Sequence, residues 1–233
     1  MSSGFSDDLL KGIDVSKYQR PGTIDWATLR ELGYSFAIVR AEYGVALDPK
    51  CLTHIRDSVS EGFSLGAYGW PQGGIKALLD LYSTHPRIHI PPSLDVEEMN
   101  KKDAPSVLGC CNEIRDAFGK GIIYTSQHYW HMLGNPAWPR DFSLWTSHYG
   151  VQHPAIPNAD GAPQDWFIWQ HEGRKPLTGE AGHATSGQAI DQNVAKPELL
   201  TVPDLTIDAE RVKQQIAMTL AQEAAEFTPT KDV

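Results

Sequence analysis

The chain has 233 residues, and at roughly 150 residues per domain this length fits one large domain with an appendage better than two full domains. Hydrophobic residues make up 41% and charged residues 21%, which excludes disordered and fibrous classes of protein. The 20 Lys and Arg against 29 Asp and Glu give a net charge of −9 with no compensating basic cluster, so a nucleic-acid-binding function is excluded.

Compartment signals in the sequence are weak. The first residues, MSSGFSDDLL, lack the basic and apolar segments of a secretory signal, and no apolar run approaches the roughly 18 residues of a membrane span. We therefore expect synthesis in the cytoplasm and no membrane partner. The three cysteines, Cys51, Cys110 and Cys111, form an odd set with one adjacent pair, which favours reduced thiols.

Short apolar segments alternate with amphipathic ones from about residue 12 to residue 200, which predicts strands alternating with helices. In chain order the expected elements are strand Gly12–Ser16, helix Asp25–Leu32, strand Ser35–Ala41, helix Cys51–Glu61, strand Ser64–Trp70, helix Gly74–Thr84, strand His89–Glu97, helix Ala104–Phe118, strand Gly121–Ser126, helix Gln127–Leu133, and strands Ser143–Tyr149, Trp166–Gln170 and Gln188–Val194. The last three strands are joined by Gly/Pro-rich segments, 150–165 and 173–187, in which no helix is expected.

Eight strands alternating with helices predict an α/β fold with a parallel sheet that can close into a barrel. We expect an irregular TIM-like barrel of about eight strands and five helices, (β/α)5(β)3. An open doubly wound sheet is the alternative. The expected organisation is an N-terminal lead over residues 1–11, a barrel over 12–200 and a tail over 201–233.

The tail has a different pattern from the barrel. Leu205–Phe227 contains no Gly or Pro and places apolar residues four positions apart, which predicts one amphipathic helix. Such a helix could pack on the side of the barrel, or it could serve self-association or docking to a particle.

Four carboxylates fall at the ends of predicted strands. Asp14 ends the first strand, Asp95 and Glu97 end the fourth, and Asp191 lies on the eighth. In barrels of this type, functional groups lie at the carboxyl ends of the strands. Strand side chains alternate between faces, so Asp95 and Glu97 point the same way. We expect all four acids to converge on one mouth of the barrel.

Converging carboxylates suit glycoside cleavage. A neighbouring negative charge or an apolar wall raises the pKa of one carboxyl and keeps it protonated, while another stays ionised. Glycosidases need this split between a proton donor and a negative group. We assign Glu97 as the general acid, because it lies farthest along its strand, and Asp95, Asp14 and Asp191 as charged or orienting groups. A single strand-end Asp, such as Asp14, also often caps a helix.

Aromatic residues cluster near the same strand ends. Sugar rings present apolar C–H faces, so an aromatic-lined cleft with acids at its floor suits a polysaccharide, although aromatic residues also fill cores. The candidates for substrate binding are Tyr18, Tyr68, Trp70, Tyr124, Trp145, Tyr149 and Trp169, with Tyr43 nearby.

Eight segments resemble, in order and spacing, the family 25 glycoside hydrolases, the Chalaropsis-type lysozymes. They are GIDVSKYQ with Asp25-Trp26 after it, FAIVRAEYG, GAYGW, PSLDVEE, GIIYTSQHYW, LWTSHY, WQH and AIDQN, and together they span about residues 12–196. The resemblance implies a modified barrel and an N-acetylmuramidase that hydrolyses the β-1,4 bond from N-acetylmuramic acid to N-acetylglucosamine in bacterial peptidoglycan. It implies no cofactor.

The resemblance also implies roles for individual residues. Glu97 corresponds to the proton donor, and Asp95 to the residue that holds or polarises the N-acetyl group of the substrate. Tyr68 and Trp145 correspond to cleft aromatics. Arg40 lies at a common basic position, where an ion pair with an acid is an equally good interpretation.

Some features depart from the family pattern. Tyr68-Gly69-Trp70 stands where many members have Tyr-His-Phe, and Glu98 adds an acid beside Glu97. No wall-binding module follows the barrel. The best fit is a lysin of a phage or prophage, made in the cytoplasm without a signal peptide and acting on the cell wall after release or as part of a phage particle.

Three other functions remain to be weighed. A non-catalytic wall-binding or structural component of a phage particle could share the fold, although it would have no need of four acids. A metal enzyme is disfavoured, because His128 and His131 lack the Glu of a zinc motif, so no metal ligands are assigned. The third alternative is a chitinase, but the segment SLDVEE meets only half of the chitinase signature.

The spacing of the carboxylates does not decide the stereochemistry of the reaction. Retention, inversion and participation of the N-acetyl group are all compatible with it.

Overall fold

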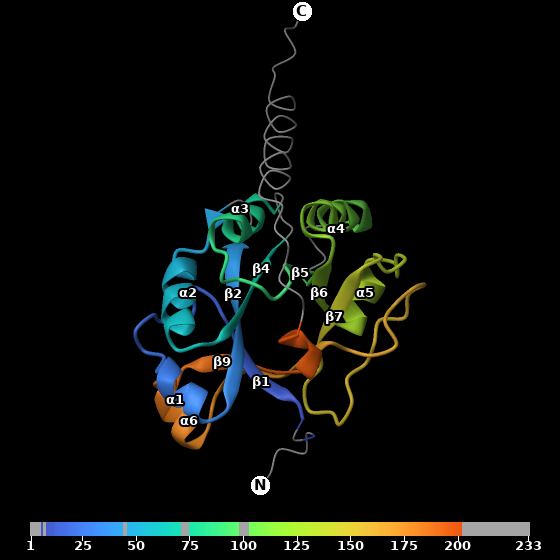
Figure 1. Ribbon diagram of the computed structural model, residues 1–233. Coiled ribbons are helices and arrows are strands. Elements are labelled where there is room, and N and C mark those ends of the chain that lie inside the picture. The colour runs from blue at the N-terminus through green and yellow to red at the C-terminus, as the bar shows by residue number, and fades with distance from the viewer. Residues whose placement is uncertain (1–5, 7, 44–45, 71–74, 98–102, 202–233) are drawn as a thin grey trace, which may run out of the picture.

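The computed structural model describes residues 6, 8–43, 46–70, 75–97 and 103–201. Its central feature is a closed barrel of eight strands with helices around the outside (Figure 1). The barrel strands are β1 (Leu10–Val15), β2 (Tyr34–Tyr43), β4 (Ser64–Gly69), β5 (Ser93–Asp95), β6 (Gly121–Thr125), β7 (Phe142–Ser147), β8 (Ile168–Pro176) and β9 (Ala189–Ala195). A two-residue strand, β3 (Ala46–Leu47), pairs with the end of β2. The predicted irregular α/β barrel is confirmed.

The barrel closes at β1, which pairs in parallel with β2 and antiparallel with β9. Because β9 also runs antiparallel to β8, the barrel is mixed, and the expectation of a parallel sheet is wrong for this last strand. The reversal places Asp191 near the beginning of β9, at the same end of the barrel as the last residues of the parallel strands.

Six helices lie within the described residues: α1 (Trp26–Glu31), α2 (Cys51–Ser60), α3 (Lys76–Thr84), α4 (Ala104–Phe118), α5 (Gln127–Met132) and α6 (Gly179–Ala184). Local sequence explains several of their ends. The side chains of Asp25, Asp103 and Ser126 accept hydrogen bonds from the first turns of α1, α4 and α5. Gly119, in the left-handed conformation at φ 77°, ends α4.

Four elements differ from the predictions. β5 is shorter than the predicted strand His89–Glu97, because Pro91 and Pro92 have no N–H to donate to a neighbouring strand. β8 continues to Pro176 instead of ending at Gln170. Helix α6 and a 3-10 turn at Pro197–Leu199 were not expected. α6 packs beside α1, where the Asp25 N–H donates to the Ala184 carbonyl at 2.6 Å, so a tertiary contact supports this short helix.

The core has two parts. One lies between the strands and the surrounding helices, and the other fills the barrel interior with an apolar layer that includes Phe36, Ile38, Ile122 and Ile168. Gly12 makes room for this filling, because a Cβ there would lie 2.4 Å from the Phe36 ring. Above this apolar layer, Asp14, Gln170 and Asn193 are buried polar side chains at the end of the barrel where the parallel strands finish.

Three further predictions concern other parts of the chain. The predicted helix Leu205–Phe227 lies outside the described residues. Among the residues that are described, no helix combines the length and apolar character needed to span a bilayer. The three cysteines are free and buried, as the sequence predicted.

Candidate active site

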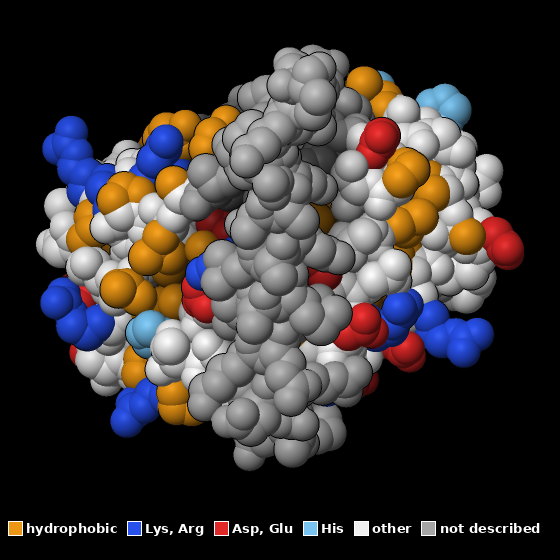
Figure 2. All heavy atoms as spheres, turned by 90° about the horizontal axis from the view of Figure 1, so that it is seen from above, with side chains coloured by type: hydrophobic (Ala, Val, Ile, Leu, Met, Phe, Trp, Pro, Cys, Tyr) orange, Lys and Arg blue, Asp and Glu red, His pale blue; other side chains and the backbone are white. Residues whose placement is uncertain are grey.

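The four predicted acids lie around one end of the barrel. Asp14 and Asp191 are directly opposite each other on β1 and β9. Asp95 is the last residue of β5, in register with Tyr124 of β6, and Glu97 follows two residues later. Asp14 and Asp95 are 5% and 8% exposed, whereas Glu97 and Asp191 are partly buried. Figure 2 views this end of the molecule, with Asp and Glu side chains near the centre of the face.

Two amide side chains hold the carboxyl group of Asp14. The Asn193 Nδ2 donates to Asp14 Oδ2 at 2.7 Å, and the Gln170 Nε2 donates to the same oxygen at 2.9 Å. The orientation of Asn193 is determined by Trp145, whose indole N–H can only donate and does so to Asn193 Oδ1 at 2.8 Å. Asp14 is therefore held by groups on β8 and β9.

Gln170 is oriented in a similar way. Its Oε1 accepts hydrogen bonds from the hydroxyl groups of Tyr124 (2.9 Å) and Tyr149. Two donors at Oε1 direct the Nε2 toward Asp14. The amides and tyrosines form one connected network beneath the acids, which is the arrangement that keeps a functional group in a single geometry.

The pKa of Asp14 is raised well above its ordinary value. Burial is the largest cause, the nearby Asp191 carboxylate is the next, and Glu97 adds to both. The hydrogen bonds from Asn193 and Gln170 act in the opposite direction, because they favour the charged form. The acids thus interact electrostatically, and the negative charges of Asp191 and Glu97 favour the protonated form of Asp14.

Aromatic rings form the layer below the acids. The Trp145 ring contacts Tyr124 and Tyr68 edge-on, with ring centroids 4.7 and 6.1 Å apart. Asp95 and Glu97 are among the charges that raise the pKa of the buried Tyr124 hydroxyl, after burial itself. Tyr149 is 48% exposed and lies at the edge of this layer.

Tyr18 is exposed and contacts the buried Arg40 of β2. Tyr18 is 72% exposed, and its ring centroid is 5.3 Å from the Arg40 Cζ. The Arg40 Nε donates to Asp48 Oδ2 at 2.8 Å, in a buried ion pair. The interpretation of Arg40 as an ion-pair partner is therefore correct, but its partner is Asp48 and not one of the four acids.

One of the predicted aromatic residues, Trp169, faces away from the acids. Trp70 lies one residue beyond the end of β4 at Gly69, is 6% exposed, and contacts the Tyr43 ring with centroids 4.3 Å apart. Side chains alternate along a strand, and the neighbours Ile168 and Gln170 face the barrel interior, so Trp169 faces outward. The Trp169 indole N–H donates to the His148 carbonyl at 2.8 Å, which is a packing role.

A sequence profile described as "Glycosyl hydrolases family 25" matches residues 13–180, well over half of the chain. The chain belongs to this family. The motif resemblance is thereby confirmed. Lysozyme M1 of Streptomyces globisporus is 25% identical over 198 residues, a match that covers 74% of this chain and 65% of that protein. This family 25 chain thus spans just under two thirds of the length of that relative.

Solved structures share the fold. The bacterial lysozyme from Streptomyces coelicolor superposes with a TM-score of 0.66 at 20% identity, covering 88% of this family 25 chain and all of the other. A family GH25 lysozyme from Aspergillus fumigatus gives 0.63 at 17% identity, over 80% and 93% of the two chains. The CTP1L endolysin gives 0.59 at 20% identity, over 82% and 68%.

Three residues of this family 25 site were not singled out by the sequence reasoning: Gln170, Asn193 and Asp48. The sequence contains a signal that could have identified two of these residues. Asn193 lies two positions after Asp191 on the same strand face, and Gln170 lies within the WQH segment. Asp48 follows the two-residue strand β3 and carries no such pattern. Within the described residues, no group of three or more His, Cys, Asp or Glu could hold a metal ion.

Proposed function

We propose that the protein is an N-acetylmuramidase that hydrolyses the β-1,4 bond between N-acetylmuramic acid and N-acetylglucosamine in bacterial peptidoglycan. The observation that supports this proposal best is the gathering of Asp14, Asp95, Glu97 and Asp191 at one end of a family 25 barrel. Of the predicted aromatic residues, Tyr18 and Tyr149 are exposed and offer rings against which the apolar face of a sugar can pack, whereas Trp145 and Tyr124 are buried and support the acids from below.

In the proposed reaction, the Glu97 carboxyl gives its proton to the glycosidic oxygen as the bond from that oxygen to the anomeric carbon breaks. Asp95 holds the N-acetyl group and stabilises positive charge at the anomeric carbon. Water then adds to that carbon, and its proton returns to Glu97. Asp14 and Asp191 bring further negative charge to the site, with Asp14 held in place by Asn193 and Gln170.

The test is hydrolysis of purified peptidoglycan by the wild type and by Glu97→Gln. We expect Glu97→Gln to lose more than about 100-fold in rate, since the proton donor is removed, and Asp95→Asn to lose a similar factor. Glu61→Gln, an exposed change at the end of α2, is the matched control and should keep full activity. Muramic acid at the new reducing end identifies the cleaved bond.

Two results would contradict the proposal. Equal background clearing by the wild type and Glu97→Gln would indicate a non-catalytic wall-binding protein. If Asp14→Asn were more damaging than both Glu97→Gln and Asp95→Asn, the roles assigned to the acids would be wrong.

The biological setting is part of the same proposal. A lysin of a phage or prophage, made in the cytoplasm and reaching the wall on release or within a particle, fits a family 25 barrel, and the CTP1L endolysin shares this fold. Mass spectrometry of purified particles and of the lysate would separate the two routes.

A further inference from the structure

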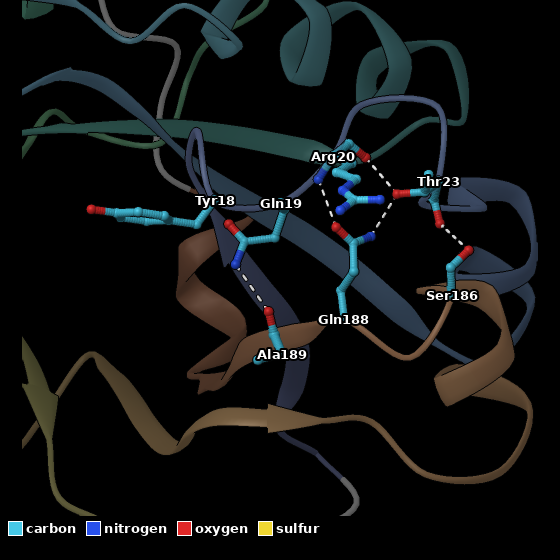
Figure 3. A pocket seen from close by; sticks show the side chains of 7 residues that line it. All are labelled: Tyr18, Gln19, Arg20, Thr23, Ser186, Gln188 and Ala189. Atoms are coloured by element: carbon cyan, nitrogen blue, oxygen red, sulfur yellow. Dashed lines mark hydrogen bonds between the residues drawn. The ribbon is translucent and has the colours of Figure 1, made fainter.

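A pocket of about 460 Å³, lined mostly by polar residues, lies beside the ends of β1 and β9 (Figure 3). It is lined by Tyr18, Gln19, Arg20, Thr23, Ser186, Gln188 and Ala189. These residues belong to the segment after β1 and to the segment that leads into β9. β1 and β9 are also the strands that carry Asp14 and Asp191, so the pocket lies next to the cleft along the rim of the barrel.

The walls of the pocket are joined by hydrogen bonds. The Gln188 Oε1 accepts from the Arg20 backbone N–H at 2.6 Å, and the Gln188 Nε2 donates to the Thr23 hydroxyl at 2.6 Å. The Ser186 hydroxyl donates to the Thr23 carbonyl at 2.9 Å. These contacts link the two segments and leave a preformed hollow, as expected of a binding site.

Arg20 is the charged group of this pocket. Its backbone is held by Gln188, but its guanidinium forms no ion pair with any carboxylate of the described residues. The side chain is exposed on a protein whose net charge is −9. A guanidinium without an internal partner favours an anionic group, and its paired N–H donors match a carboxylate.

Tyr18 connects the pocket with the cleft. Its ring extends away from the other lining residues (Figure 3) and contacts the guanidinium of Arg40. Arg40 lies in the barrel and is 6% exposed, and its charge is one of those that act on Tyr68, in the aromatic layer. Tyr18 therefore lines the pocket and also contacts a barrel residue whose charge acts on the aromatic layer.

We infer that this pocket is a subsite for a carboxylate carried by the wall polymer, bound by Arg20 while the glycan lies across the acids. The inference rests on the proposed function, since it places another part of the same substrate. The carboxylate belongs either to the stem peptide or to the lactyl group of a muramyl residue without a peptide.

The test compares Arg20→Gln with the wild type on three polymers: peptidoglycan with its peptides, peptidoglycan freed of peptides by an amidase, and the peptide-free glycan with its carboxylates methyl-esterified. We expect KM to rise about fivefold on polymers with carboxylates, with kcat unchanged, because the charge acts on binding and not on bond cleavage. Arg20→Lys should recover part of the loss. Arg140→Gln, an exposed change before β7 at the other end of the barrel, is the charge-matched control.

The three polymers distinguish the possible results. A KM effect confined to the peptide-bearing polymer assigns the stem peptide. An effect on the peptide-free glycan that is lost on esterification assigns the lactyl carboxylate, which is free only where the peptide has been removed. An unchanged KM for Arg20→Gln, or an equal loss on the esterified glycan, would overturn the inference while leaving the proposed function intact. Inactive wild-type protein would overturn both.

Discussion

At the scale of single residues, Asp14 is controlled by the amides that surround it. Burial and the Asp191 carboxylate raise its pKa, and the N–H groups of Asn193 and Gln170 lower it. The balance makes Asp14 sensitive to changes that do not touch its own side chain. The amides therefore tune the charge of the site as well as its geometry.

Asn193→Leu is predicted to raise the pKa of Asp14 further, because a hydrogen bond that favours the charged form is lost. The limb of the kcat/KM pH profile that reports Asp14 should move to higher pH, and the rate should fall about tenfold. Gln170→Leu removes the other donor and should move the same limb in the same direction. A loss of activity that is equal at every pH would show instead that Asn193 only supports the packing of Trp145.

At the scale of elements, helix α3 begins on a buried carboxyl group. The Ala77 N–H in its first turn donates at 2.9 Å to Glu42 Oε2 from β2. Burial raises the pKa of Glu42 from 4.5 to about 8, against the opposing effect of this bond, and the charges of Asp80 and Glu113 add to the rise. Folding therefore favours the protonated form of Glu42.

This shift predicts how stability depends on pH. Between the unfolded pKa of 4.5 and the folded pKa of about 8, the folded protein binds more protons at Glu42, so the free energy of unfolding falls as the pH rises. Glu42→Gln keeps an acceptor for Ala77 and removes the ionisation. We expect it to stabilise the protein by about 2 kcal/mol or more near pH 8, with little effect near pH 5.

Urea unfolding at the two pH values measures this difference, and the m-value should stay the same. Asp57→Asn, a change on the solvent side of α2, provides a control that should shift neither midpoint by much. If Glu42→Gln altered stability equally at both pH values, packing rather than protonation would be responsible.

At the scale of the whole molecule, the net charge of −9 opposes the approach to a polymer that carries carboxylates. Raising the ionic strength from about 0.01 M to about 0.15 M screens this repulsion and should lower KM for the wall. The effect should weaken as the pH falls toward about 5.4, the isoelectric point expected from the sequence, because the net negative charge becomes small. Rates of wall clearance across a salt series at both pH values give the measurement, and a KM that rises with salt at neutral pH would refute this account.

Local patterns in the sequence were enough to place the barrel strands and the four acids. The period of two along a strand puts Asp95 and Glu97 on one face, and the apolar and amphipathic alternation predicts strands and helices in the right order. Each of these signals lies within a few residues, so a single sequence carries it. The same alternation, applied to Ile168 and Gln170, would also have directed Trp169 away from the cleft.

Only the tertiary structure decided which groups meet. The pairing of Asp14 with Asp191 requires the barrel to close and β9 to run antiparallel, and no local pattern encodes a contact between the two ends of the barrel domain. No local pattern predicts that amides from β8 and β9 hold Asp14, or that Asp48 pairs with Arg40. Helix α6 was also missed, because it depends on a contact with α1. The sequence alone determined the chemistry that is present and the order of the elements, while long-range strand pairing and burial decided the geometry and the protonation of the site.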